Sequence, residues 1–251
     1  MNLRFITIFF MAATSLYSAA NQKLRLYGLF TDNMVIQRDV EVPVWGSSAP
    51  DSKITVTFAN KSFHTKTNRQ GKWELRLPPM KADTRPLVLK VTCKDEKIVL
   101  KNILIGEIWI CTGQSNMFLP LSRTSDSKTA ISAANRPEIR LLRLPPSFGP
   151  EQKALAPGLK WAVCAPDSVK KFSAVGYYFG REIHRKLNVP VGLIQVAYGG
   201  TKIEAWTPAD TVKQYSPKTY QQYLKFLKAM KQDEKAERTR FAMKFRKSKK
   251  L

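Results

Sequence analysis

Residues 103–117 read ILIGEIWICTGQSNM, and this stretch decides the fold of the second part of the chain. Residues 103–111 are almost continuously apolar, without the alternation typical of a half-exposed strand. They therefore predict a central parallel strand that is buried on both faces. The Thr-Gly-Gln that follows predicts a tight turn, and the residues from Ser115 predict the start of a helix. A serine between a buried strand and a helix is how several hydrolases expose a nucleophile.

The chain after this turn continues with strands and a helix. Residues 138–145 (EIRLLRLP) predict a second strand, and residues 189–200 (VPVGLIQVAYGG) predict another buried one. Between them, apolar residues at helical spacing predict a helix that ends at Asn188 and Pro190. Its predicted apolar face consists of Phe172, Val175, Phe179, Ile183 and Leu187. This order predicts a parallel sheet flanked by helices, with ligands bound at the carboxyl ends of the strands.

Residues 21–102 follow a different pattern. Short runs such as SKITVTFAN (52–60) and GKWELRLP (71–78) alternate apolar and polar residues, and Gly, Pro, Asn and Asp separate the runs. The pattern predicts a small antiparallel β-sandwich module ahead of the α/β part. We therefore expect one domain at 21–102 and a second at 103–210, followed by a basic helical segment at 211–251.

The first twenty residues have the pattern of a secretory signal peptide. Arg4 lies near the start, a mostly apolar run follows, and small residues end the segment at Ala20. We expect cleavage after Ala20 and export to the periplasm or the extracellular space. A membrane anchor is the less favoured alternative, because the apolar run is shorter than the roughly 20 residues that a spanning helix needs.

The formal net charge is +23, which on its own indicates an acidic partner. From Thr211 to Leu251, 13 Lys and Arg stand against three acids, so +10 of the excess lies in this segment. The remainder is diffuse and carries no basic motif interleaved with aromatic residues, so nucleic acid is not an expected partner. From Pro217 a thin apolar stripe predicts a basic amphipathic helix. It either lies on a membrane or, as we favour, packs on its own protein.

The three cysteines are Cys93, Cys111 and Cys164. They form no CxxC pair, and no His/Cys/Asp cluster has the spacing of metal ligands. We expect Cys111 to be a buried thiol because it ends the apolar run before Ser115. A single bridge between Cys93 and Cys164 is an open alternative.

Serine-dependent ester hydrolysis needs a nucleophile, a base, and donors for the developing oxyanion. Ser115 is placed for the first role, and a helix behind it would offer backbone N–H groups. Gly199 and Gly200 suit the third role, because a backbone without side chains can come close to a substrate. The alternative interpretation is structural: Ser115 as a helix cap and the two glycines as an ordinary turn.

The base is the missing element. Of the two histidines, His64 lies in the predicted β module and is expected on its surface. His184 lies in the predicted helix between Arg181 and Arg185, where a solvated surface histidine is the better interpretation. Taken alone, the residues predict an exported α/β protein with half of a serine hydrolase site.

Three segments carry a family resemblance. GEIWICTGQSNMFLPL (106–121) closely resembles the nucleophile block of the sialate O-acetylesterases, which belong to the SGNH (GDSL-like) hydrolase superfamily. FSAVGYYFGREIHRKLNVPVGLIQVAYGGTKIEAW (172–206) resembles their second block. LYGLFTDNMVIQRDVEVPVWGSSAP (26–50) is similar to the β module that precedes their catalytic domain.

The resemblance implies a role for each matching residue. Ser115 matches the family nucleophile, and Gly199–Gly200 match the glycine block that helps to form the oxyanion hole. The implied reaction removes O-acetyl groups from sialic acids through an acetyl-Ser115 intermediate, with no metal or organic cofactor. The implied partner is an O-acetylated sialic acid or another acetylated glycan.

This sequence also departs from the family pattern. Family members are longer and carry a WYQGES-like block and, near their end, an acid and a histidine that complete the catalytic group. The WYQGES-like block and a later histidine do not occur here. We therefore expect an incomplete SGNH-type sheet with an uncovered edge, whose activity as a single chain is an open question. Phe118 stands where relatives usually have an acid, which would change the pocket wall. Gln195 and Tyr198 replace Asn and Trp, and are expected to be packing changes.

Two other functions stay open at this stage. Related enzymes of similar motif deacetylate xylan, and the residues do not distinguish a sialic acid from a xylose unit. A non-catalytic protein that binds acetylated or anionic glycans is the second alternative. The basic charge mildly favours a carboxylated sugar, because it attracts an anion.

Overall fold

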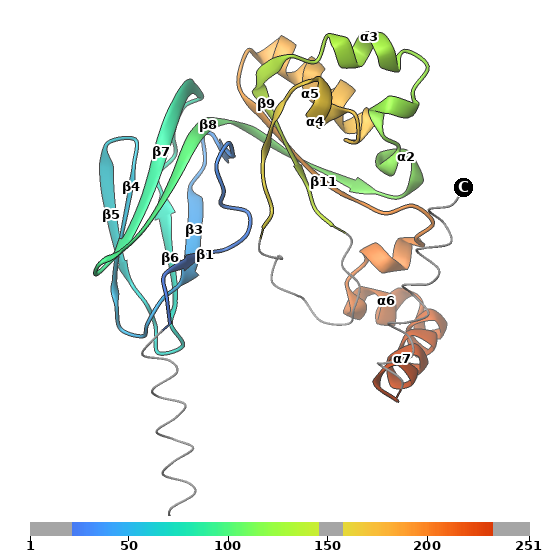
Figure 1. The fold of residues 1–251 in the computed structure, drawn as a ribbon. Coiled ribbons are helices and arrows are strands. Elements are labelled where there is room, and N and C mark those ends of the chain that lie inside the picture. Colours follow the sequence, from blue (N-terminus) through green and yellow to red (C-terminus); the bar gives the residue numbers. More distant parts are fainter. Residues whose placement is uncertain (1–21, 146–157, 233–251) are drawn as a thin grey trace, which may run out of the picture. The chain divides into compact units, whose positions relative to one another are not determined.

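The computed structural model describes residues 22–145 and 158–232, shown in colour in Figure 1. The predicted signal peptide and the last part of the predicted basic segment lie outside the described residues. The described residues fall into two compact units, 22–145 with 158–199, and 200–232. Each unit is described by itself.

The N-terminal strands form antiparallel pairs around one core. β1 (Arg25–Leu26), β3 (Val42–Ser47) and β6 (Lys72–Leu77) form a three-stranded sheet. β4 (Lys53–Phe58), β5 (Lys61–Lys66) and β7 (Asp83–Cys93) continue into a larger sheet. The inward residues of β4 and β6 are all buried in the same cluster: Ile54, Val56, Phe58, Trp73, Leu75 and Leu77. The alternation predicted for these runs is confirmed.

β8 (Glu96–Gly113) is 18 residues long and connects the two parts of the first unit. Its first half pairs with β7, and its middle pairs in parallel with β2 (Val35–Gln37). Its last part, from Glu107 to Gly113, pairs in parallel with β11 (Val191–Ala197). The boundary predicted between residues 102 and 103 falls within this strand.

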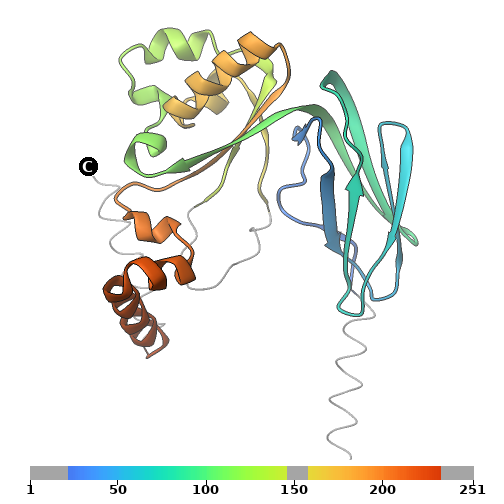
Figure 2. The ribbon, with the colours of Figure 1, turned by 180° about the vertical axis from the view of Figure 1, so that it is seen from behind.

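The parallel part of the sheet has the strand order β9–β11–β8, where β9 spans Arg136–Arg143. β10 (Ala162–Cys164) adds an antiparallel strand beside β9. Four helices follow or precede these strands: α2 (Ser115–Phe118), α3 (Ser127–Ser132), α4 (Pro166–Val169) and α5 (Ala174–Leu187), together with the 3₁₀ turn η1 (Leu121–Arg123). They gather on one side of the sheet, as both views show (Figures 1 and 2).

The two faces of this sheet are covered by different layers. Ile139, Leu141 and Leu193 belong to the cluster under the helices. Leu142 and Ile194 belong to the core of the β module.

Burial on both faces was predicted for the strands at 103–111 and 189–200. It is confirmed for β11, whose second face is covered, within the described residues, by the β module instead of by helices. It is wrong for the last part of β8, which was expected to be central but is an edge of the described sheet, with Trp109 and Ile110 40% and 66% exposed.

Helix α5 begins after Ser173, whose hydroxyl accepts from the N–H of Gly176, and ends at Asn188 with φ 52°. The predicted helix is confirmed, but its predicted apolar face is only partly correct: Phe172 is buried and Ile183 packs on the core, whereas the other three residues do not. Val175, Phe179 and Leu187 are 49%, 40% and 47% exposed. The buried residues of the helix are Ala174, Gly176, Tyr177 and Gly180.

Two glycines account for the face through which α5 packs on the sheet. A Cβ on Gly176 would lie 2.9 Å from the Sγ of Cys111, and one on Gly180 would lie 2.6 Å from the Cδ1 of Leu193. Because both glycines lack that atom, the helix axis comes close to the sheet. Hydrophobic periodicity does not detect a face built from small residues.

The outer edge of β8 is only partly paired in the described structure. Beyond β2, the N–H of Ile108 donates to the Oε1 of Gln37 at 2.8 Å. No described strand continues this edge alongside Ile110, which is 66% exposed. On the helix side, Trp109 is 40% exposed and its ring meets that of Phe179 edge-on at 4.9 Å. The uncovered edge that was predicted is therefore found among the described residues.

The second unit is helical. It contains the 3₁₀ turn η2 (Ile203–Trp206), α6 (Ala209–Tyr215) and α7 (Pro217–Gln232). The indole N–H of Trp206 donates to the Thr201 hydroxyl at 2.8 Å. The helix predicted from Pro217 is confirmed as α7. Within the described part of the chain, helices of the length and apolarity needed to cross a membrane do not occur.

Candidate active site

Ser115 lies at the turn where β8 ends. Gly113 closes the strand with φ 146°, a backbone conformation that other residues rarely adopt. Ser115 then opens α2 and is exposed. The N–H of Phe118 bonds to the Gln114 carbonyl at 2.8 Å, which closes a single helical turn. The predicted strand–turn–helix is present, but one turn carries too few aligned peptides for the helix dipole that the sequence suggested.

Gly199 lies directly beside Ser115. β11 ends at Ala197, and the N–H of Tyr198 donates to the Gly113 carbonyl at 3.0 Å, which ties the ends of the two strands together. A Cβ on Gly199 would stand 3.6 Å from the Oγ of Ser115. The fold therefore brings together two of the three predicted site residues.

Gly200, the third predicted residue, begins the second unit. Its φ is 77°, and a Cβ built there meets no described atom within 4 Å. The positive φ suits a glycine, so the Gly-Gly pair has a conformational reason at its second position. The oxyanion role of Gly199 and Gly200 stays a prediction.

Aromatic and cationic side chains flank this turn. The rings of Phe118 and Tyr198 meet at 60° with centroids 6.2 Å apart. The Cζ of Arg143, from the last residue of β9, lies 5.5 Å from the centroid of the Phe118 ring. Tyr198 was expected to be a packing change, and its ring does pack against that of Phe118, on the helix that Ser115 opens. Sequence reasoning missed Arg143, although its place at the end of a predicted strand was a usable signal.

A network of hydrogen bonds fixes the turn that carries Ser115 to the sheet and to α5. The side chain of Gln195 is 1% exposed, and its Oε1 accepts from the N–H of Ser173 at 3.0 Å. The Ser173 hydroxyl donates to the Sδ of Met117 at 3.2 Å. Backbone bonds from Leu121 to Phe172 and from Ala174 to Leu119 fasten the residues after α2 to the start of α5. Gln195 is buried, as expected of a packing residue, and it also positions the cap of α5.

His184 lies at the opposite end of the sheet from Ser115. Its Nδ1 is 2.9 Å from the Val189 carbonyl, so this nitrogen carries the proton and donates. Val189 precedes β11, whereas Ser115 follows the strand paired with it, and a seven-residue strand spans about 20 Å. His184 is therefore not the base for Ser115. It is also half-buried and bonded, not the solvated surface residue that was expected.

His64 is also remote from the serine. It lies in β5, which is separated from β8 by β4 and β7 in the sheet. Its Nδ1 is 3.1 Å from the hydroxyl of Thr55, and the residue is exposed, as expected. Neither histidine of the chain therefore contacts the nucleophile.

Comparison with known proteins now decides the family. A family model described as "Carbohydrate esterase, sialic acid-specific acetylesterase" matches residues 105–241, more than half of the chain. The chain belongs to this family.

The relatives agree with this assignment. The sialate O-acetylesterases of Pongo abelii and Homo sapiens are each 27% identical to this chain over 207 residues, covering 75% of it and 40% of the relative. The crystal structure of a carbohydrate acetylesterase from Xanthomonas citri matches with a TM-score of 0.73 and 35% identity, covering 76% of this chain and 44% of that one. This chain thus spans about two fifths of the length of these relatives.

The three cysteines of this acetylesterase-family chain are free and buried, so the alternative bridge between Cys93 and Cys164 is not formed. Burial raises the pKa of Cys111 to about 11 and that of Cys164 to about 12. A thiol with such a pKa stays neutral and unreactive near neutral pH. Cys111 therefore does not compete with Ser115 as a nucleophile. Among the described side chains, no group of three His, Cys, Asp or Glu is arranged to hold a metal ion.

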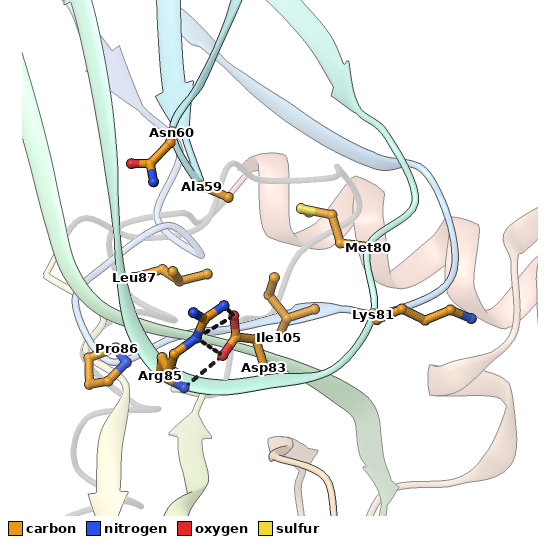
Figure 3. A pocket seen from close by; sticks show the side chains of 9 residues that line it. All are labelled: Ala59, Asn60, Met80, Lys81, Asp83, Arg85, Pro86, Leu87 and Ile105. Atoms are coloured by element: carbon orange, nitrogen blue, oxygen red, sulfur yellow. Dashed lines mark hydrogen bonds and ion pairs between the residues drawn. The ribbon is translucent and has the colours of Figure 1, made fainter.

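A separate cavity of about 500 Å³ lies in the β module, away from every predicted site residue (Figure 3). It is lined by Ala59, Asn60, Met80, Lys81, Asp83, Arg85, Pro86, Leu87 and Ile105. The guanidinium of Arg85 donates to both carboxylate oxygens of Asp83, at 2.7 and 3.0 Å, and this bonding holds the pKa of Asp83 below its usual value. Because that carboxylate is occupied, the cavity offers no free acid or base for hydrolysis.

Proposed function

We propose that this chain supplies the nucleophile of a sialate O-acetylesterase-type carboxylic ester hydrolase. The observation that carries the proposal is the exposed Ser115 beside the bare backbone of Gly199, at the joined carboxyl ends of β8 and β11. Membership of the acetylesterase family supports the same chemistry.

In the proposed reaction, the Oγ of Ser115 attacks the acetyl carbonyl carbon. The Oγ–C bond forms, the bond from that carbon to the sugar oxygen breaks, and the sugar leaves as its alcohol after taking up a proton. Water then attacks the acetyl-Ser115 ester and releases acetate. The N–H groups of Gly199 and Gly200 stabilise the oxyanion in both steps. A donor of this kind typically contributes a factor of about 10²–10³ in rate.

The base for Ser115 comes, in this proposal, from a part of the SGNH-type fold that the described residues do not include. Both histidines of the chain are remote from Ser115, and the relatives are more than twice as long as the region they share with it. Loss of such a partner typically leaves only the catalysis due to binding and the oxyanion hole. Slow hydrolysis by the isolated chain is therefore expected.

The proposed substrate is an O-acetylated sialic acid outside the cytoplasm. The sialate O-acetylesterase relatives support this choice, and export follows from the proposed signal peptide. Acetylated xylan is the second candidate, since the Xanthomonas relative is described only as a carbohydrate acetylesterase.

Acetate release tests the proposal. The purified chain is incubated with 9-O-acetyl sialic acid or acetylated xylan, beside a Ser115→Ala variant. Ser122→Ala is the matched control, because Ser122 is also an exposed serine in a short helical turn. We expect slow release that requires Ser115, is unchanged in Ser122→Ala, and increases when imidazole supplies the missing base. Binding of sialoglycans without release, even with imidazole, would instead establish a non-catalytic glycan-binding protein.

A further inference from the structure

Arg143 lies at the same end of the sheet as the proposed nucleophile. In the register of the parallel strands, Gln195 of β11 pairs with Arg143 on one side and with Cys111 on the other. With strands about 4.8 Å apart, Arg143 starts about 10 Å across the sheet from the strand that carries Ser115. Arg143 is the last residue of β9 and Ser115 follows the end of β8, so both lie at the carboxyl ends of the strands, where parallel sheets bind ligands.

The side chain of Arg143 points toward the serine turn. Along β9, Ile139 and Leu141 face the helices, and the two-residue repeat of a strand puts Arg143 on the same face. Its guanidinium extends past the end of β11 to the ring of Phe118 on α2. Phe118 in turn meets Tyr198, the neighbour of Gly199. The guanidinium is therefore held by a ring of the same short helix that Ser115 opens.

The guanidinium is available to a ligand. Arg143 is exposed, and among the described residues no Asp or Glu forms an ion pair with it. Stacking on an aromatic face restricts the side chain but leaves the N–H groups at its edge free. A guanidinium held this way is suited to bind a carboxylate through two parallel hydrogen bonds.

We propose that Arg143 is the residue that selects a carboxylated sugar at this site, by pairing with the carboxylate of the sialic acid whose acetyl group reaches Ser115. This inference rests on the proposed function and narrows its substrate class. In sialic acid, the carboxylate and the O-acetylated glycerol side chain are attached to the two ring carbons that flank the ring oxygen, so one sugar can present both groups to the site. A cation and a nucleophile at the same end of the sheet can engage these two groups of one sugar, whereas a xylose unit has no carboxylate to offer.

Binding without turnover tests the inference, because it does not depend on the missing base. The purified chain is titrated with N-acetylneuraminic acid, with its uncharged methyl ester, and with xylotriose, by NMR or calorimetry. The test variant is Arg143→Met, which keeps a long side chain against Phe118 but removes the charge. Arg181→Met is the matched control, because Arg181 also lies over a ring, that of Tyr178 at 5.1 Å, but in the middle of α5.

We expect the acid to bind at least tenfold more tightly than its methyl ester, as for a charge-assisted hydrogen bond. Arg143→Met should remove this preference and leave the affinity for the ester unchanged, while Arg181→Met should change neither. The preference should also shrink as the salt concentration rises. Equal binding of acid and ester by the unmodified chain, or equal weakening of both by Arg143→Met, would overturn the inference.

The two proposals fail separately. Acetate release that needs Ser115 but is indifferent to Arg143 and to the charge of the sugar would leave the esterase proposal intact and refute the role of Arg143. Arg143-dependent binding of the acid without any Ser115-dependent release would refute the esterase proposal and retain the carboxylate site.

Discussion

The two ends of the parallel strands β8, β9 and β11 are built in opposite ways. At the amino-terminal end the backbones touch: the Glu107 N–H donates to the Pro190 carbonyl at 2.9 Å, and a Cβ on Gly106 would lie 1.9 Å from that oxygen. At the carboxyl end, Ser115 and Arg143 are exposed and Gly199 has room for a methyl group. The difference indicates that one end holds the fold together, while the other is free to carry chemistry.

The largest expected effect comes from adding one methyl group at each end. Gly106→Ala should destabilise the fold by about 3 kcal/mol or more, because the backbone must move to admit the Cβ. Gly199→Ala should change the free energy of unfolding by less than about 0.5 kcal/mol. It should nevertheless reduce Ser115-dependent acetate release, because its methyl group stands against the serine. Urea denaturation and acetate assays measure the two effects, and equal destabilisation by both variants would break the comparison.

Two arginines of β9 test the same difference, because Arg140 is buried in the fold and Arg143 is exposed at the carboxyl end of the strand. Arg140 is 3% exposed and donates to the carbonyls of Pro137, Asn33 and Asn102, at 2.8, 3.3 and 3.3 Å. Arg140→Met should cost about 2–3 kcal/mol, since it leaves buried acceptors without donors. Arg143→Met should be neutral in the same denaturation experiment. A destabilising Arg143→Met would mean that Arg143 serves packing and not ligand binding.

The pH dependence of the free energy of unfolding tests whether the thiols of Cys111 and Cys164 are buried in a tightly packed core. Cys111 and Cys164 have pKa values of about 11 and about 12 when folded, above the ordinary 9.0, because burial disfavours the thiolate. A thiol whose pKa is higher in the folded than in the unfolded state contributes fully to stability below its unfolded-state pKa. This contribution is lost as the pH rises through the folded-state pKa, because the unfolded thiol loses its proton first. The urea midpoint should therefore fall between about pH 9 and 11. The fall should be smaller in a Cys111→Ala/Cys164→Ala variant, and an identical fall would contradict the assignment.

The smallest effect is expected for His184, which lies at the amino-terminal end of the parallel strands. His184→Ala removes the hydrogen bond to the Val189 carbonyl and should cost about 1 kcal/mol. Because His184 is at the far end of the strands, Ser115-dependent acetate release should not change. His64→Ala, at an exposed position of β5, is the matched control and should leave both quantities unaltered. A loss of release in His184→Ala alone would show that the two ends are coupled.

The sequence was most informative where the signal is local. Alternation along β4 and β6 and the termination of α5 at Asn188 each reflect a few neighbouring residues. The placement of Ser115 at a turn after a strand follows from the same kind of pattern, although the apolar run before it did not show that this end of β8 is an exposed edge. The prediction that Gly199 and Ser115 share a strand-end edge was also correct, because parallel strands align their carboxyl ends.

What failed depends on contacts between distant segments. Three residues of the predicted apolar face of α5, Val175, Phe179 and Leu187, were placed wrongly. The helix packs through Gly176 and Gly180, which carry no hydrophobic signal. The β module covers one face of the parallel sheet through Leu142 and Ile194, and strand periodicity alone does not say what covers a face. Arg143 was overlooked because the sequence does not show that its guanidinium lies over the ring of Phe118, a residue 25 positions earlier in the chain.

Because all three cysteines are buried, a cysteine introduced on the surface of this chain can be labelled selectively. In the folded state Cys93, Cys111 and Cys164 are shielded from solvent, so a maleimide dye or a fluorine tag has no native thiol to modify. A Ser115→Cys variant would place one exposed sulfur at the turn after β8. A fluorine tag on that sulfur would report, in a single resonance, when a sugar or a second polypeptide comes to rest beside the turn.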